Sequence, residues 1–246
     1  MTKSERKNIV GIIPARYGST RFPGKPLVDI AGKPMIQHVY ESCIQSCLFD
    51  KVYIATDDQR IQEVVNGFDA ECIMTSSECQ SGTERITEAI VSRNIQSEII
   101  VNIQGDEPGI KKAQLESVIS LFNRPEVEIA SLYKKFSPEE NPQDPNKVKV
   151  IFNAQNKAIY FSRSLIPYNR SGENTDYFKH IGIYAYRNSI LREISKLKST
   201  KLERLESLEQ LRWIEHNHAI YLAETNIENI SIDTPADLKS FLKNLT

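Results

Sequence analysis

The stretch of this chain best suited to chemistry is a loop near the N-terminus that is rich in glycine, proline and cationic side chains. Residues 12–27 read IIPARYGSTRFPGKPL, so an apolar run leads directly into the loop. Its glycines allow a tight bend and a close approach to a ligand. Such a loop, at the carboxyl end of a first strand, is where an open α/β sheet holds its ligand, and several cations there suit a polyphosphate. The alternative is an ordinary solvated loop. The cations are Arg16, Arg21 and Lys25.

Carboxylates follow two further strand-like stretches. Asp106 comes soon after the apolar run 98–103, and Asp233 follows the strand-like residues 230–232. Asp106 is a good metal candidate because Gly105 leaves room for an ion and its waters. Mg²⁺ is commonly held by one or two carboxylates plus substrate phosphates. Together with the cationic loop, the two acids predict a metal–nucleotide site, although each acid alone could be a turn residue or a helix cap.

The segment 80–85, QSGTER, begins a predicted helix with two hydroxyl side chains and a glycine. Free N–H groups at a helix start, together with these hydroxyls, could bind a base or a phosphate. The simpler interpretation is a capped helix N-terminus without a ligand.

The elements that must position these residues alternate through the first half of the chain. Strand-like and helix-like segments in alternation predict a mostly parallel sheet with helices on both faces. The expected strands are 10–13, 52–55, 72–74 and 98–103, and the apolar positions of the expected helices fall within 35–44, 61–65, 86–90 and 115–122.

The pattern changes after residue 128, where strands follow one another with few helices between them. Residues 129–133, 147–152, 157–161 and 181–186 are strand-like, and 153–156 is typical of a hairpin turn. This predicts a mainly antiparallel lobe inserted at about 128–187 within a single domain of residues 1–246. Two helices are expected afterwards. The first spans 203–215 with Leu205, Leu208, Leu211 and Ile214 buried, and the second spans 234–245 with Thr234 as its cap.

Composition excludes some functions. The formal net charge of −1 gives no general attraction to nucleic acids or acidic membranes, so neither is expected as a partner. The polar N-terminus lacks the hydrophobic region of a signal peptide, and no apolar stretch approaches the roughly 18 residues of a membrane span. The spacing of the four cysteines does not fit a metal site, and Cys43 and Cys47 are expected on one apolar helix face. A reduced, cytoplasmic enzyme is the default expectation.

Long motifs along essentially the whole chain resemble the 3-deoxy-manno-octulosonate cytidylyltransferase (CMP-Kdo synthetase) family, within the larger group of nucleotide-sugar pyrophosphorylases. The matching pieces are the loop 12–27, ATDD at 55–58, QSGTER at 80–85, NIQGDEP at 102–108, DPNKVKV at 144–150, YFSRSLIPY at 160–168, KHIGIYAYR at 179–187, LERLESLEQLR at 202–212 and IDTPADL at 232–238.

The resemblance implies a Rossmann-like α/β fold of the nucleotide-diphospho-sugar transferase type, whose inserted β lobe binds the sugar and forms a homodimer. It also implies the reaction of CTP with Kdo to give CMP-Kdo and pyrophosphate, for lipopolysaccharide biosynthesis. In that reading Ala15, Arg16, Lys25, Ser81 and Gly82 bind CTP, and Arg16 and Lys25 contact its phosphates. Asp106 and Asp233 bind Mg²⁺. The sugar acid is held by Gln104, Arg163, His180, Tyr184, Glu209 and Gln210.

The expected mechanism is an in-line attack of the sugar's anomeric hydroxyl on the α-phosphate of CTP. Arg16, Lys25 and one Mg²⁺ would neutralise the triphosphate, and a second Mg²⁺ shared by Asp106 and Asp233 would lower the pKa of that hydroxyl. Two alternatives stay open. The sugar could be another ulosonic acid, such as the 8-amino analogue of Kdo or a sialic acid. The protein could also be a catalytically silent nucleotide binder.

Overall fold

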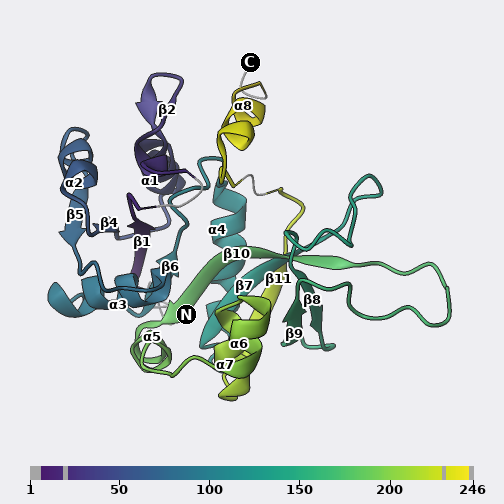
Figure 1. Ribbon diagram of the computed structural model, residues 1–246. Coiled ribbons are helices and arrows are strands. Elements are labelled where there is room, and N and C mark those ends of the chain that lie inside the picture. The colour runs from purple at the N-terminus through teal and green to yellow at the C-terminus, as the bar shows by residue number, and fades with distance from the viewer. Residues whose placement is uncertain (1–6, 19–21, 229–230, 244–246) are drawn as a thin grey trace, which may run out of the picture. The chain divides into compact units, whose positions relative to one another are not determined.

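The structure, a computed structural model, describes residues 7–18, 22–228 and 231–243 (Figure 1). The chain divides into two compact units. Residues 1–113 together with 229–246 form the first unit, and residues 114–228 form the second. The C-terminal segment therefore returns to the unit that contains the N-terminal half.

The first unit is built around a parallel sheet with strand order β6-β1-β4-β5, as the alternating pattern predicts. Five of the seven residues of β1 are buried and none is fully exposed, which fits a central strand covered on both faces. The bounds are β1 Ile9–Ala15, β4 Lys51–Thr56, β5 Glu71–Met74 and β6 Ile99–Asn102.

The predicted helices of this unit are confirmed. Pro34 occupies the N-cap of α1, and the side chain of Asp58 caps α2 by accepting from the Arg60 N–H. Cys43 is buried as expected, but Cys47 ends α1 in a left-handed conformation and is exposed, so its place on the apolar face was wrong. The elements are η1 Lys25–Leu27, β2 Asp29–Ile30, β3 Lys33–Pro34, α1 Met35–Ser46, α2 Gln59–Asn66, α3 Gly82–Ser92 and α8 Pro235–Lys243; α4 Lys112–Ser120 begins at the boundary between the units.

The second unit contains mainly antiparallel pairs. Strand β10 pairs with β7 and β8, and β8 forms a hairpin with β9 through the predicted turn at 153–156. One parallel partner of β7, the strand β11, was not predicted. The elements are η2 Leu121–Asn123, β7 Ile129–Lys135, β8 Lys149–Phe152, β9 Ala158–Ser162, β10 Phe178–Arg187, α5 Asn188–Ile194, α6 Lys201–Glu206, α7 Gln210–Glu215 and β11 Ile220–Glu224.

The single helix expected at 203–215 is two helices. Helix α6 ends at Ser207, whose φ of 51° lies in the left-handed region and stops the helix. The change of direction leaves Leu205 71% exposed, while Leu208 and Leu211 are buried as expected. Ile214 is only partly buried. None of the helices in the described residues combines the length and the hydropathy needed to cross a membrane.

Candidate active site

A cavity of about 350 Å³ lies in the first unit at the carboxyl ends of β1 and β6. Its size is within the range typical of small-molecule sites. The cavity brings together all seven residues that the sequence predicted for the nucleotide and the metal, as well as Gln104 from the predicted sugar set. The lining residues are Pro14, Ala15, Arg16, Lys25, Pro26, Cys79, Gln80, Ser81, Gly82, Arg85, Gln104, Gly105, Asp106 and Asp233.

A single ammonium group joins the two acids in this cavity. Lys25 Nζ donates to Asp106 Oδ2 at 2.6 Å and to Asp233 Oδ1 at 2.9 Å. The Lys25 side chain is only 12% exposed. Although burial lowers the pKa of Lys25, the two carboxylates outweigh it and the pKa stands above its ordinary value. Lys25 is therefore a cation fixed between two anions that are 127 residues apart in the chain.

Asp233 reaches this position because its neighbours are packed into the core of the first unit. Ile232 is fully buried in a cluster with Ile30, Met35 and Phe241, and its N–H donates to the Asp106 carbonyl at 3.0 Å. The preceding residues were expected to form a strand. Ser231 and Ile232 lie outside any strand, and Ile230 is outside the described residues.

Two further features set the geometry around the acids. Thr234 and Asp237 cap α8 reciprocally, since the Thr234 N–H donates to Asp237 and the Asp237 N–H donates to Thr234 Oγ1. Gly105 is required for a different reason, because a Cβ atom there would lie 3.0 Å from the Pro14 carbonyl oxygen. Strand ends and α8 are thereby held close enough for Lys25 to bridge them.

The cationic loop folds back on itself before it reaches Lys25. The Gly24 N–H donates to the Tyr17 carbonyl at 2.9 Å, and Gly24 has a φ of +71° that favours glycine. Ala15 is buried and Arg16 is exposed. Arg21, the third cation expected in this loop, is outside the described residues.

The start of α3 forms another wall of the cavity. Ser81 caps the helix by accepting from the Glu84 N–H, and Glu84 accepts in turn from the Gln80 N–H. Arg85, which sequence reasoning did not select, is buried and donates to Thr75 Oγ1 and to Asp57. Its place in the QSGTER motif was the available signal.

Cys79 also lines the cavity, and the sequence gave no signal for it. Its thiol donates to Glu88 at 3.0 Å. Burial, with the neighbouring Glu88 carboxylate, raises the pKa of Cys79 to about 12, so the thiol stays protonated and unreactive.

The donor set suits Mg²⁺ better than a transition metal. Within the described ranges, no group of three or more His, Cys, Asp and Glu side chains is arranged to hold an ion. Asp106 and Asp233, however, both lie within reach of the same ammonium. Two carboxylates are sufficient for Mg²⁺ when substrate phosphates and waters supply the remaining ligands. The residues present therefore fit the expected ion.

Five of the six residues predicted for the sugar lie in the second unit, and two of them lie on β10. His180 Nε2 is 2.8 Å from Ser131 Oγ, and burial lowers the pKa of His180 to about 3. The imidazole is therefore neutral at physiological pH. The Tyr184 hydroxyl is buried and has no hydrogen-bond partner in the described part of the chain. Burial raises the pKa of Tyr184 well above its ordinary value, so its hydroxyl keeps a proton to donate.

The remaining predicted sugar residues have different surroundings. The Arg163 guanidinium donates to the carbonyl groups of Glu206, Pro145 and Ser207, at 2.7, 3.0 and 3.4 Å. Glu209 is half-buried at the start of α7, and Gln210 is buried beside it. Gln104, in the first unit, donates weakly to Asn102 at 3.4 Å.

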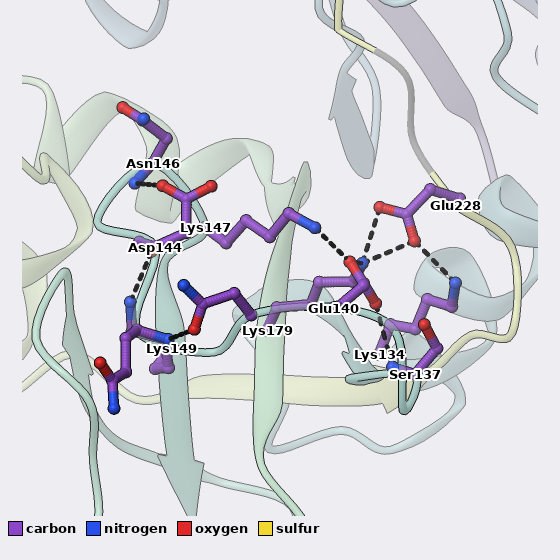
Figure 2. A network of polar contacts seen from close by, with 11 residues as sticks. Lys134, Ser137, Glu140, Asp144, Asn146, Lys147, Lys149, Lys179 and Glu228 are labelled. Carbon is purple, nitrogen blue, oxygen red and sulfur yellow. Dashed lines mark hydrogen bonds and ion pairs between the residues drawn. The ribbon is translucent and has the colours of Figure 1, made fainter.

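Lys179, the residue before His180, belongs to a buried ionic network (Figure 2). Lys179 is 3% exposed and donates to both Glu140 and Glu228, as Figure 2 shows. Lys147 adds a second ammonium to Glu140, and Lys134 adds one to Glu228. The network links the loop before β8 and the segment after β11 to the two central strands of the second unit.

A parallel sheet whose strand ends carry a cationic loop, a capped helix start and the Asp106 carboxylate, with Asp233 brought in just before α8, is typical of a nucleotidyltransferase. The comparisons with known proteins specify the class further. Residues 10–227 match the family model described as cytidylyltransferase. A 3-deoxy-manno-octulosonate cytidylyltransferase from Phocaeicola vulgatus is 47% identical, over 95% of this chain and 97% of its own length. An 8-amino-3,8-dideoxy-manno-octulosonate cytidylyltransferase from Shewanella piezotolerans is 44% identical, over 94% and 96%.

A solved structure agrees with these sequence matches. The CMP:2-keto-3-deoxy-manno-octonic acid synthetase in complex with CTP superposes with a TM-score of 0.91 at 42% identity, covering 97% of this chain and 98% of that one. A 4-diphosphocytidyl-2C-methyl-D-erythritol synthase from Anaerococcus prevotii shares the fold at 15% identity and a TM-score of 0.66. The chain belongs to the CMP-Kdo synthetase family of cytidylyltransferases.

Proposed function

We propose that this protein transfers a cytidylyl group from CTP to 3-deoxy-D-manno-octulosonate, giving CMP-Kdo and pyrophosphate. The family membership and the likeness to a CTP-bound synthetase support the reaction class. One structural observation links the proposed reaction to the cavity. Lys25 lies between Asp106 and Asp233 inside the cavity, so the cation for a triphosphate and the acids for a metal are already together.

The chain's own residues would act mainly by positioning and by charge neutralisation. Arg16 and Lys25 would bind the triphosphate, and the start of α3 at Ser81 and Gly82 would face the nucleotide. The oxygen of the sugar's C2 hydroxyl then bonds to the α-phosphorus, the bond from that phosphorus to pyrophosphate breaks, and the hydroxyl proton is released. Mg²⁺ bound by Asp106 and Asp233 would supply charge stabilisation and a more acidic hydroxyl.

The predicted sugar residues remain part of the proposal. The Tyr184 hydroxyl carries a proton and lacks a partner among the described residues, so it suits a hydroxyl or carboxylate of a sugar acid. His180 is a neutral donor or acceptor on the same strand. Arg163 could bind a carboxylate only with donors that its three carbonyl contacts leave available. Gln104, Glu209 and Gln210 complete the proposed set.

A specific observation supports the 8-amino analogue of Kdo as a second candidate substrate. Relatives that carry this activity in their names are 44% identical, close to the 47% of a relative named as a 3-deoxy-manno-octulosonate cytidylyltransferase. The two sugars differ only at C8, so distal contacts decide between them. Homodimerisation through the β lobe at 128–187, the single-domain organisation and a cytoplasmic location also stay predictions.

The test is pyrophosphate release with Mg²⁺ and CTP, with and without Kdo, run beside ATP, GTP and UTP. Release that needs both CTP and Kdo supports the proposal. The assay is then repeated with the 8-amino sugar and with a sialic acid. Release only with one of these moves the specificity to that sugar. CTP binding without pyrophosphate release in the presence of any of these sugar acids favours a silent nucleotide binder.

A further inference from the structure

An arginine outside the cavity contacts the loop that carries the cations. The Arg60 guanidinium, on α2, lies over the Tyr17 ring with 3.3 Å between its central carbon and the ring centroid. Tyr17 belongs to the cationic loop, directly after Arg16. Arg60 is not among the residues that line the cavity.

Asp58 fixes the guanidinium in place. Arg60 donates to both carboxylate oxygens, from Nε at 2.9 Å and from Nη2 at 2.6 Å, and the same carboxylate caps α2. A bidentate pair of this kind sets the plane of the guanidinium as well as its place. Asp58 therefore balances the charge of Arg60, and the flat face of the Arg60 guanidinium packs on the Tyr17 ring.

Tyr17 also contacts the end of the loop that precedes Lys25. A Cβ atom at Gly24 would lie 3.1 Å from the Tyr17 hydroxyl oxygen and ring, so the ring packs directly against the Gly24 backbone. The Tyr17 carbonyl also accepts from the Gly24 N–H. Gly24 precedes Lys25, and Tyr17 follows Arg16. Each of the two cations proposed for the phosphates, Arg16 and Lys25, is therefore adjacent in the chain to one member of the Tyr17–Gly24 contact.

We propose that Arg60 and Tyr17 are positioning residues that brace the cationic loop, so that Arg16 and Lys25 are placed for the CTP phosphates before CTP binds. This inference rests on the proposed function, because it takes CTP as the ligand of the loop. The brace lowers the cost of ordering Arg16 and Lys25 on binding. Its loss weakens CTP binding and leaves the sugar acid's own contacts unchanged.

The test compares the CTP dissociation constant, measured by calorimetry without sugar, in Arg60→Met, Tyr17→Phe, Tyr17→Ala and wild type. Removing an exposed cation–π contact raises the constant roughly twofold to fivefold in Arg60→Met. Tyr17→Phe, which keeps the ring, stays near wild type, and Tyr17→Ala weakens binding at least as much as Arg60→Met. In turnover assays the KM for CTP rises in the same proportion, while kcat at saturating CTP and the KM for the sugar acid are unchanged.

Arg124→Met is the matched control, because Arg124 also pairs with an acid two residues away and lies over a tyrosine ring, that of Tyr221. Equal weakening of CTP binding by this control would overturn the brace. The double variant Tyr17→Ala/Arg60→Met separates a brace from a direct phosphate contact. Non-additive loss supports the brace, whereas full additivity assigns Arg60 to the nucleotide and overturns it.

The two proposals fail in different ways. Wild type that binds CTP but turns over no ulosonic acid contradicts the proposed reaction and leaves the brace to be judged on the dissociation constants. Wild type that binds no CTP overturns both. Arg60→Met with the wild-type dissociation constant overturns the brace alone, and thermal unfolding of each variant excludes a general loss of fold.

Discussion

At the scale of single residues, Lys25 has two sets of partners that compete for its ammonium. Its ammonium balances Asp106 and Asp233 in the structure, yet it is also the cation proposed for the triphosphate. A divalent cation that arrives alone must displace this ammonium from the carboxylates. A cation that arrives with CTP meets less competition, because the phosphates offer Lys25 a new partner.

The substitution Lys25→Met should therefore separate metal binding from catalysis. Without the ammonium, two neighbouring carboxylates lack their counter-charge, so the affinity of the unliganded protein for Mn²⁺ should rise roughly fivefold to tenfold. Turnover should fall sharply. Mn²⁺ binding is measured by electron paramagnetic resonance without nucleotide. Lys33→Met, which removes an exposed ammonium paired with Glu41 in the same unit, is the control. Unchanged Mn²⁺ affinity would contradict the competition.

The acids themselves are tested by Asp106→Asn and Asp233→Asn. Each amide keeps the shape of the side chain but removes a charge from the proposed metal site. Pyrophosphate release should fall by roughly a hundredfold or more in each variant. Thermal unfolding should change little, because both carboxylates are partly exposed. Near-normal turnover in either variant would contradict the role of the two acids as metal ligands.

At the scale of elements, the sequence predicted what depends on local pattern. The apolar runs of β1 and β6 and the turn at 153–156 identify strands and a hairpin, and the alternation of strand-like and helix-like segments predicts the parallel sheet. The break at Ser207 was missed, because serine rarely adopts a positive φ and the leucine spacing continues through it. The exposure of Leu205 follows from that break.

The candidate site shows the same limit. Motifs selected Lys25, Asp106 and Asp233, but spacing alone could not show that one ammonium joins both acids. That geometry depends on Ile232 packing with Ile30 and on a backbone contact to Asp106. The contact of Arg60 with Tyr17 likewise depends on how α2 packs, which no local pattern of residues encodes.

The buried network in Figure 2 makes a prediction about the elements it joins. Lys179→Met removes the central ammonium and leaves Glu140 and Glu228 with one lysine each. Since Glu140 is largely buried, the free energy of unfolding should fall by about 2–4 kcal/mol. Lys135→Met removes an exposed pair with Asp176 and should change it by less than about 1 kcal/mol. Urea unfolding measures both, and equal effects would show that Lys179 adds no more stability than an exposed ion pair.

At the scale of the whole molecule, charge matters through local pairs, since the formal net charge is only −1. Several carboxyl groups have a lowered pKa in the folded protein. Although burial opposes it, hydrogen bonds from Lys147 and Lys179 lower the pKa of Glu140 to about 2. Pairing with Arg212 lowers the pKa of Glu203, and pairing with Lys134 and Lys179 lowers that of Glu228, in both cases against burial.

The lowered pKa values of these carboxyl groups and of His180 all change the stability of the fold in the same direction with pH. A group whose pKa is lower in the folded state leaves the unfolded chain binding more protons, so stability is lost as pH falls. For His180 the loss runs from about pH 6.5 down to about 3. For Glu140 it runs from about pH 4.5 down to about 2.

The free energy of unfolding should therefore decrease below pH 6.5 and decrease more steeply below pH 4.5. Urea titrations at a series of pH values test this course. The variant His180→Phe removes the imidazole, so its stability between pH 6.5 and 5 should depend less on pH by up to about 1.4 kcal/mol per pH unit. Glu140→Gln should flatten only the region below pH 4.5. A wild-type profile that is flat from pH 7 to 5 would show that the His180 imidazole can take up a proton in the folded protein.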